Sequence, residues 1–191
     1  MSKGRLEAFS DAIFAIVMTI MVLELTPPVA SELGSLASLL PKVLTYAFSF
    51  LLLAIYWVNH HHLFQAVQRV NGSILWANMH LLFWLSLIPF VTAWAGDHGS
   101  VPVPVAAYGV VLLVAAVAYY ILVRALLGAH GADSTLASAI GGDTKGKLSI
   151  LIFAVAIAAS FFSTLLGWAL YIAVALIWLV PDRRIENTLG R

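Results

Sequence analysis

The chain of 191 residues is 62% hydrophobic and only 10% charged, with a formal net charge of +1. A soluble domain with so few charges would lack a polar surface, so the composition indicates an all-α, polytopic membrane protein. Cysteine is absent, which excludes disulfides and thiolate metal sites. The sequence contains no basic run, no phosphate-binding loop and no hydrolase motif, so we expect neither a nucleic-acid partner nor an enzyme.

Six hydrophobic segments predict six transmembrane helices in a single domain that covers residues 1–191. The first segment ends before Pro27 and Pro28, the second begins at Pro41, and Pro89 predicts a kink in the third. The last two would be joined by a tight turn near residues 163–167; one tilted helix there would give five spans. The expected spans cover approximately residues 5–26, 41–60, 74–96, 103–127, 147–163 and 167–181.

The distribution of basic residues predicts the orientation of these helices. With the N-terminus in the cytoplasm, six spans leave only Lys42 on the outer side, whereas five would place the C-terminal arginines outside. The positive-inside rule therefore favours six spans with both termini in the cytoplasm. The inner basic residues would be Lys3, Arg5, Arg69, Arg124, Lys145, Lys147, Arg183, Arg184 and Arg191.

This orientation places polar side chains from four helices at one depth near the inner face. An ionised aspartate in the membrane costs about 2.5–3.5 kcal/mol, so Asp11 should be paired with another helix. The candidate partners are the His60–His62 run and Arg124. The layer would hold the bundle together; alternatively, its histidines could also sense pH or bind a metal or haem. Its members beyond the first helix are Trp57, His60, His61, His62, Asn78, His80 and Arg124.

The first helix also carries an apolar stripe. Ile13, Ile16, Ile20 and Leu23 recur at i, i+3, i+7 and i+10, and Thr19 lies beside them. Such a stripe packs against neighbouring helices or lipid in most membrane proteins.

The stretch RLEAFSD at the start of the first helix has the form Arg-x-x-x-Phe-Ser-Asp. It resembles the signature of the endosomal and lysosomal potassium channel family, the transmembrane protein 175 family, particularly its bacterial members. Trp57 with the following histidines, and LSLIPFVT in the third segment, support the resemblance. The six expected spans in a chain of this length agree with it.

The resemblance implies a homotetramer in the bacterial inner membrane, with the first helix lining one central pore. It implies that potassium is preferred over sodium without the usual selectivity filter, and no bound cofactor besides the permeant ion. The narrowest ring would be Ile16, followed by Ile20 and Leu23, with a hydroxyl layer at Thr19. The signature residues would hold helices together rather than line the pore; they are Arg5, Phe9, Ser10 and Asp11.

Elementary physics adds what such a pore would do. Rings of Ile and Leu cannot replace the hydration shell of an ion, so a narrow ring dewets and blocks conduction until it widens. Glu24, one residue beyond Leu23, could add an acidic ring at the outer mouth, where helix C-termini also attract cations.

Two other functions fit parts of the sequence. A b-type haem redox protein could use His60, His61, His62 or His80 as axial ligands. A proton-coupled transporter could use Asp11 or Glu24 as the proton carrier, although the repeated halves and paired broken helices typical of transporters are not evident.

Overall fold

The computed structural model describes residues 2–27, 33–131 and 143–179, with side chains from residue 37 onward in the second range. Within these residues every regular element is helical, as the composition predicts. The order of the elements is α1 (Lys3–Ile20), η1 (Met21–Glu24), α2 (Leu33–Gln65), α3 (Gly72–Leu85), α4 (Ile88–Asp97), α5 (Pro102–His130), α7 (Thr144–Ser160) and α8 (Thr164–Leu179).

The third predicted span is broken into two helices, and the break confirms the kink expected at Pro89. α3 begins where the Asn71 side chain accepts a hydrogen bond from the Ile74 amide at 3.0 Å, an N-cap that satisfies one orphan donor. Ser86 and Leu87 separate α3 from α4, and Pro89 lies in the first turn of α4, where its missing N–H costs nothing. Together the two helices form one candidate membrane span, Gly72–Asp97.

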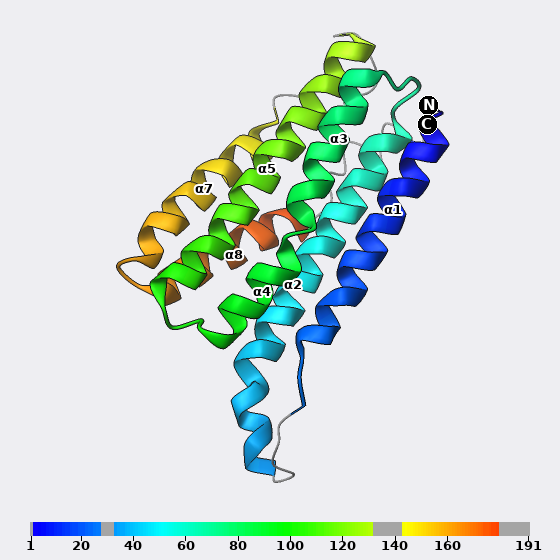
Figure 1. The fold of residues 1–191 in the computed structure, drawn as a ribbon. Helices are drawn as coiled ribbons and strands as arrows, with labels where there is room; N and C mark the ends of the chain where they lie inside the picture. The colour runs from blue at the N-terminus through cyan, green and yellow to red at the C-terminus, as the bar shows by residue number, and fades with distance from the viewer. Residues whose placement is uncertain (1, 28–32, 132–142, 180–191) are drawn as a thin grey trace.

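α2 begins at Leu33, eight residues before the predicted start of the second span at Pro41, and continues through this proline. A helix can pass through a proline at the cost of one backbone hydrogen bond. Here that loss falls near the end of α2 that extends beyond the other helices (Figure 1). One turn later, the Thr45 hydroxyl donates to the Pro41 carbonyl at 2.9 Å.

Within the described residues, four segments are long and apolar enough to cross a membrane: Lys3–Glu24, Ala37–Gln65, Gly72–Asp97 and Pro102–His130. α7 and α8 have 17 and 16 residues, which corresponds to about 25 Å of helix. Their turn lies at residues 161–163, three residues earlier than the predicted centre. Gly167 consequently belongs to α8 and packs against Ser160 of α7. The predicted cytoplasmic connection at 128–147 lies mostly outside the described residues.

The core is built around α5, and α1 lies at one edge of the bundle beside α2, with α7 at the opposite edge (Figure 1). Tyr108, Ala115, Ala118 and Leu122 of α5 are fully buried. The buried Tyr108 hydroxyl contacts Ser49 of α2 at 2.8 Å, and Thr92 of α4 donates to Ser49 at 2.7 Å. These hydroxyl groups satisfy one another's hydrogen bonds inside the subunit. α1 lies outside this most densely packed region.

Candidate functional site

α1 has two different faces. Leu6, Ser10, Phe14 and Val17, followed by Met21 at the start of η1, are all buried, and their spacing of three or four residues places them on the side that packs against α2, α3 and α4. On the opposite side Ile16, Ile20 and Leu23 are 51%, 42% and 74% exposed within one subunit. Ile13, the remaining member of the predicted stripe, is partly buried against the core. The structure therefore leaves three predicted gate residues on the outer surface of the subunit.

Thr19 lies on the same exposed side, with its side chain folded back on the helix. Its hydroxyl donates to the carbonyls of Ala15 and Ile16, at 2.8 and 2.9 Å. Because the proton is occupied by these carbonyls, the lone pairs of the Thr19 oxygen are directed away from the helix backbone. An oxygen in this state can accept from water or coordinate a cation, but it cannot readily donate.

Glu24 is the last residue of η1 and is exposed. In the described part of the chain its carboxylate forms no ion pair. The ion pair at this end of the bundle is instead Lys42 with Asp97, at 2.6 Å, which joins α2 to α4.

A chain of hydrogen bonds joins three of the four helices that contain the predicted polar layer. His60 of α2 donates from Nε2 to Asn78 Oδ1 of α3 at 2.8 Å, and Asn78 Nδ2 donates to Ser10 Oγ of α1 at 2.9 Å. Ser10 then donates to the Leu6 carbonyl within α1. Ser10, His60 and Asn78 are at most 1% exposed, so every member of this chain depends on its neighbours for satisfaction.

Asp11 is paired with another helix, as expected, but the predicted partner is wrong. Its Oδ1 accepts from the indole Nε1 of Trp57 at 2.9 Å, at the exposed boundary between α1 and α2. His60 is turned instead toward Asn78. Arg124 is exposed on α5, a helix that packs chiefly against α3 and α7. The indole is close enough because it lies on the helix directly beside α1.

The remaining residues of the predicted layer do not converge on Asp11. His61 is exposed and accepts from Gln65 in its own helix, and His80 accepts from Trp84 within α3. His62 is half-buried beside His61. The signature residues likewise divide, since Ser10 and Asp11 contact other helices, whereas Arg5 and Phe9 are exposed on the side of Ile16.

Three of the four histidines named as possible haem ligands already take part in hydrogen bonds within the subunit: His60, His61 and His80. Nε2 of His60 and Nε2 of His80 both take part in the hydrogen bonds above. Among the described residues there is also no group of three His, Asp or Glu side chains placed to hold a metal ion.

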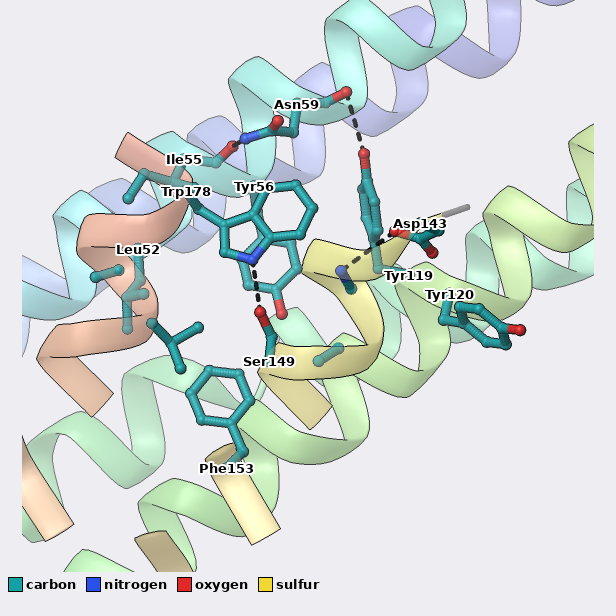
Figure 2. Close-up of a pocket in the computed structure, with 14 residues that line it drawn as sticks. Leu52, Ile55, Tyr56, Asn59, Tyr119, Tyr120, Asp143, Ser149, Phe153 and Trp178 are labelled. Carbon is teal, nitrogen blue, oxygen red and sulfur yellow. Dashed lines mark hydrogen bonds between the residues drawn. The ribbon is translucent and has the colours of Figure 1, made fainter. Parts of the chain in front are cut away.

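A cavity of about 40 Å³ lies between α2, α5, α7 and α8 (Figure 2). Its aromatic wall includes Tyr56, Tyr119 and Trp178. Tyr119 donates to the Asn59 carbonyl at 3.3 Å, and Trp178 donates to Ser149 at 2.8 Å. The volume would hold about three waters. Because no residue of α1 lines it, this cavity is separate from the face that carries the predicted gate.

Residues that the sequence analysis passed over include Ser49, Thr92 and Tyr108, the buried hydroxyl cluster described above. Ser49 and Thr92 are hydroxyl residues inside apolar segments, and such residues usually bond to another helix or to their own backbone. Their position in apolar segments could have indicated that Ser49 and Thr92 form hydrogen bonds, although it could not have identified their partners.

These features describe a helical membrane protein in which polar contacts inside the subunit hold the first helix and leave its apolar face exposed. Residues 5–89 match the family model described as endosomal/lysosomal potassium channel TMEM175. Over 99% of its length the chain is 52% identical to a Chryseobacterium protein named a potassium channel, covering 98% of that protein.

Further relatives agree with this assignment. A Streptomyces collinus protein named a potassium channel is 35% identical over 63% of this chain and 62% of its own. The crystal structure of a Chamaesiphon minutus protein, described as a lysosomal potassium-selective channel TMEM175 homologue, superimposes with a TM-score of 0.82. It has 29% identity and covers 94% of this chain and 97% of that one. The chain therefore belongs to the TMEM175 family, a family of ion channels rather than enzymes.

Proposed function

We propose that this protein is a potassium-preferring cation channel of the bacterial inner membrane. Four copies would surround one axis lined by α1, and both termini of each six-span subunit would lie in the cytoplasm. The observation that carries the proposal is the outer face of α1, where Ile16, Ile20 and Leu23 are exposed beside Thr19. The relatives named potassium channels supply the ion.

The six-span topology requires α7 and α8 to cross the membrane as a short hairpin. A hydrocarbon core is about 30 Å thick, and helices of 17 and 16 residues are slightly too short. Local thinning of the bilayer accommodates a mismatch of this size at a modest cost. The alternation of chain direction then returns the C-terminus to the cytoplasmic side, as the basic residues favour.

A pore lined by α1 would contain successive rings of side chains from four copies. The Ile16 ring would form the constriction, and the rings of Ile20 and Leu23 would extend the apolar barrier along the pore toward the outer side. Such rings exclude water when narrow and conduct only when widened. Thr19 would provide oxygens in mid-membrane with their lone pairs free to coordinate, and Glu24 would attract cations to the outer mouth.

The gate is tested by replacing Ile16 with a smaller, polar residue. We expect Ile16→Asn to raise potassium flux into liposomes several-fold, because the ring would stay hydrated at the width that now dewets. Ile172→Asn is the matched control, since Ile172 is comparably exposed, at 44%, on α8. Identical fluxes for wild type and Ile16→Asn would show that Ile16 does not form the constriction.

The contribution of Thr19 is tested by a pair of nearly isosteric variants. Thr19→Val removes the oxygen and keeps the shape, whereas Thr19→Ser keeps the oxygen. Under bi-ionic potassium and sodium gradients we expect the reversal potential of Thr19→Val to move toward zero and that of Thr19→Ser to stay near wild type. A shift shared by both variants would assign the effect to packing rather than to the oxygen.

Subunit number is measured in the same preparation by native mass spectrometry. A tetramer is expected. A monomer that still conducts would contradict a pore lined by several copies of α1.

A further inference from the structure

The ring of His130 closes the turn between α2 and α3. It belongs to the last residue of α5, and that end of α5 lies at the same end of the bundle as the turn (Figure 1). The amides of Gln68 and Arg69 both donate to His130 Nε2, at 3.1 and 3.3 Å. On its other side the ring contacts the Leu126 carbonyl through Nδ1 at 2.9 Å.

These contacts define the hydrogen-bonding role of each ring nitrogen. A carbonyl oxygen only accepts, so Nδ1 carries the proton that is donated to Leu126. Two backbone N–H groups point at Nε2, so that nitrogen must present its lone pair. A second proton on Nε2 would replace the acceptor with a donor and leave two amides without a protein partner. The clamp therefore exists only with the neutral imidazole.

The clamped turn connects the two helices that hold α1. α2 supplies Trp57 and His60, and α3 supplies Asn78. The turn is otherwise held by the buried side chain of Val67 and by the bond from its amide to the Phe64 carbonyl at 3.0 Å. Its outer residues, Gln68 and Arg69, are exposed, so His130 provides the hydrogen bonds that restrain them.

We propose that His130 is a proton-sensitive clamp on the α2–α3 turn, released when acidification on its side of the membrane protonates the ring. The part of the proposal that concerns ion flux rests on the channel function proposed above. A released turn would weaken the register of the helices that position α1, and the rings of a multi-copy pore conduct only when all copies share that register. Acidification would then lower the flux.

Other titratable groups at this end of the bundle have different contacts. His61 accepts from Gln65 inside α2, and its ring stacks on Trp57. α3 has no charged or titratable residue before His80, which contacts Trp84. Among the described residues, the remaining charged and titratable groups on the elements around the turn are His62 on α2, Arg69 on the turn, Arg124 on α5, Asp143, Lys145 and Lys147 at the start of α7, and Lys3, Arg5 and Glu7 at the start of α1.

Amide hydrogen exchange of the intact protein in detergent micelles tests the clamp directly. Between pH 8 and pH 5 we expect the protection factors of the Gln68 and Arg69 amides to fall roughly tenfold, the loss expected from about one hydrogen bond. The Ile74 amide is an internal control, because it is capped by the uncharged Asn71 side chain and should not respond. Protection at Gln68 and Arg69 that is independent of pH would overturn the proposal.

Two substitutions and one control separate the clamp from other histidines. His130→Gln places a carbonyl oxygen near the amides at every pH, so protection should remain high and the pH dependence should disappear. His130→Ala should expose both amides at every pH. His98→Gln, at the end of α4, should behave like wild type. If His130→Gln kept the full wild-type response, the clamp would be excluded even if His130→Ala failed to fold.

Potassium flux in liposomes tests the regulatory consequence. Wild-type flux should fall at least twofold from pH 8 to pH 5, and His130→Gln should lose most of this response. A pH-dependent clamp with no change in flux would overturn the regulatory part. Absence of flux in every variant would instead count against the channel function, while the exchange measurement would still decide the clamp.

Discussion

The first three helices and the last three are held together by different chemistry. Between α1, α2 and α3 the specific contacts are side-chain hydrogen bonds, from His60 through Asn78 to Ser10 and from Trp57 to Asp11. Between α5, α7 and α8 close steric contacts are added to the hydrogen bonds from Trp178 to Ser149 and from Tyr171 to the Val105 carbonyl. Tyr171 lies against Gly109, and Ser160 lies against Gly167.

This difference explains where the sequence is informative. A hydrogen bond requires a particular donor and acceptor in particular places, so the N-terminal helices have a recognisable pattern, and the family model matches residues 5–89. Steric fit can be met by many combinations of large and small residues. The C-terminal helices therefore offer mainly hydropathy to a reader of the sequence.

Gly109→Ala should produce the largest effect, because it disrupts the close packing of α5 against α8. An added Cβ would meet the Tyr171 hydroxyl and lie 2.6 Å from its Cζ and 2.8 Å from Cγ1 of Ile157. The Tyr171 side chain is buried, and its hydroxyl donates to the Val105 carbonyl at 3.1 Å, so the ring cannot move freely. We expect a loss of about 3 kcal/mol in unfolding free energy, measured by SDS titration in mixed micelles.

Gly128→Ala is the matched control in the same helix. No atom lies within 4 Å of the position that its Cβ would take, and alanine favours a helix over glycine by about 1 kcal/mol. This variant should be as stable as wild type or slightly more so. Equal losses for the two variants would refute the steric account of the α5–α8 contact.

Asn78→Leu should have the next largest effect, because it removes the hydrogen bonds that join α1, α2 and α3. The change leaves Ser10 and His60 buried without their shared partner, at a cost of about 2 kcal/mol. Asn59→Leu is the control: Asn59 is also nearly buried, but its side chain donates only to the Ile55 carbonyl of its own helix, at 2.8 Å. A cost for Asn59→Leu as large as for Asn78→Leu would show that the chain between helices adds no specific stability.

The fold could be predicted from the sequence where the signal is local. Apolar length located the helices, and Pro89 located the break between α3 and α4 because a proline favours the first turn of a helix. Helical spacing placed Ile16, Ile20 and Leu23 on one side of α1, whereas the assignment of that side to a pore came only from the family resemblance. The start of α2 was missed because Pro41 was treated as a boundary, although a helix end outside the bundle tolerates it.

The pairing inside the polar layer could not be predicted, because it depends on relative helix positions rather than on residue type. Asp11 could have been paired with a histidine or an arginine by charge alone. The structure pairs it with the uncharged indole of Trp57, since α2 lies directly beside α1. His130 was likewise missed, because its partners are backbone amides more than 60 residues away in sequence.

Trp57→Phe should produce the smallest effect. It tests how much an exposed hydrogen bond contributes to the packing of α1 against α2. The change removes the indole donor and keeps a ring at the same place. Both partners are exposed within one subunit, and hydrogen bonds between membrane helices are worth about 0.6 kcal/mol on average, so we expect a loss near that value. Trp76→Phe is the control, because Trp76 is 76% exposed on α3. A loss of several kcal/mol confined to Trp57→Phe would mean that Asp11 is buried by a neighbouring copy in the assembled protein. In a preparation of dissociated subunits, the loss of unfolding free energy caused by Trp57→Phe should then be small again.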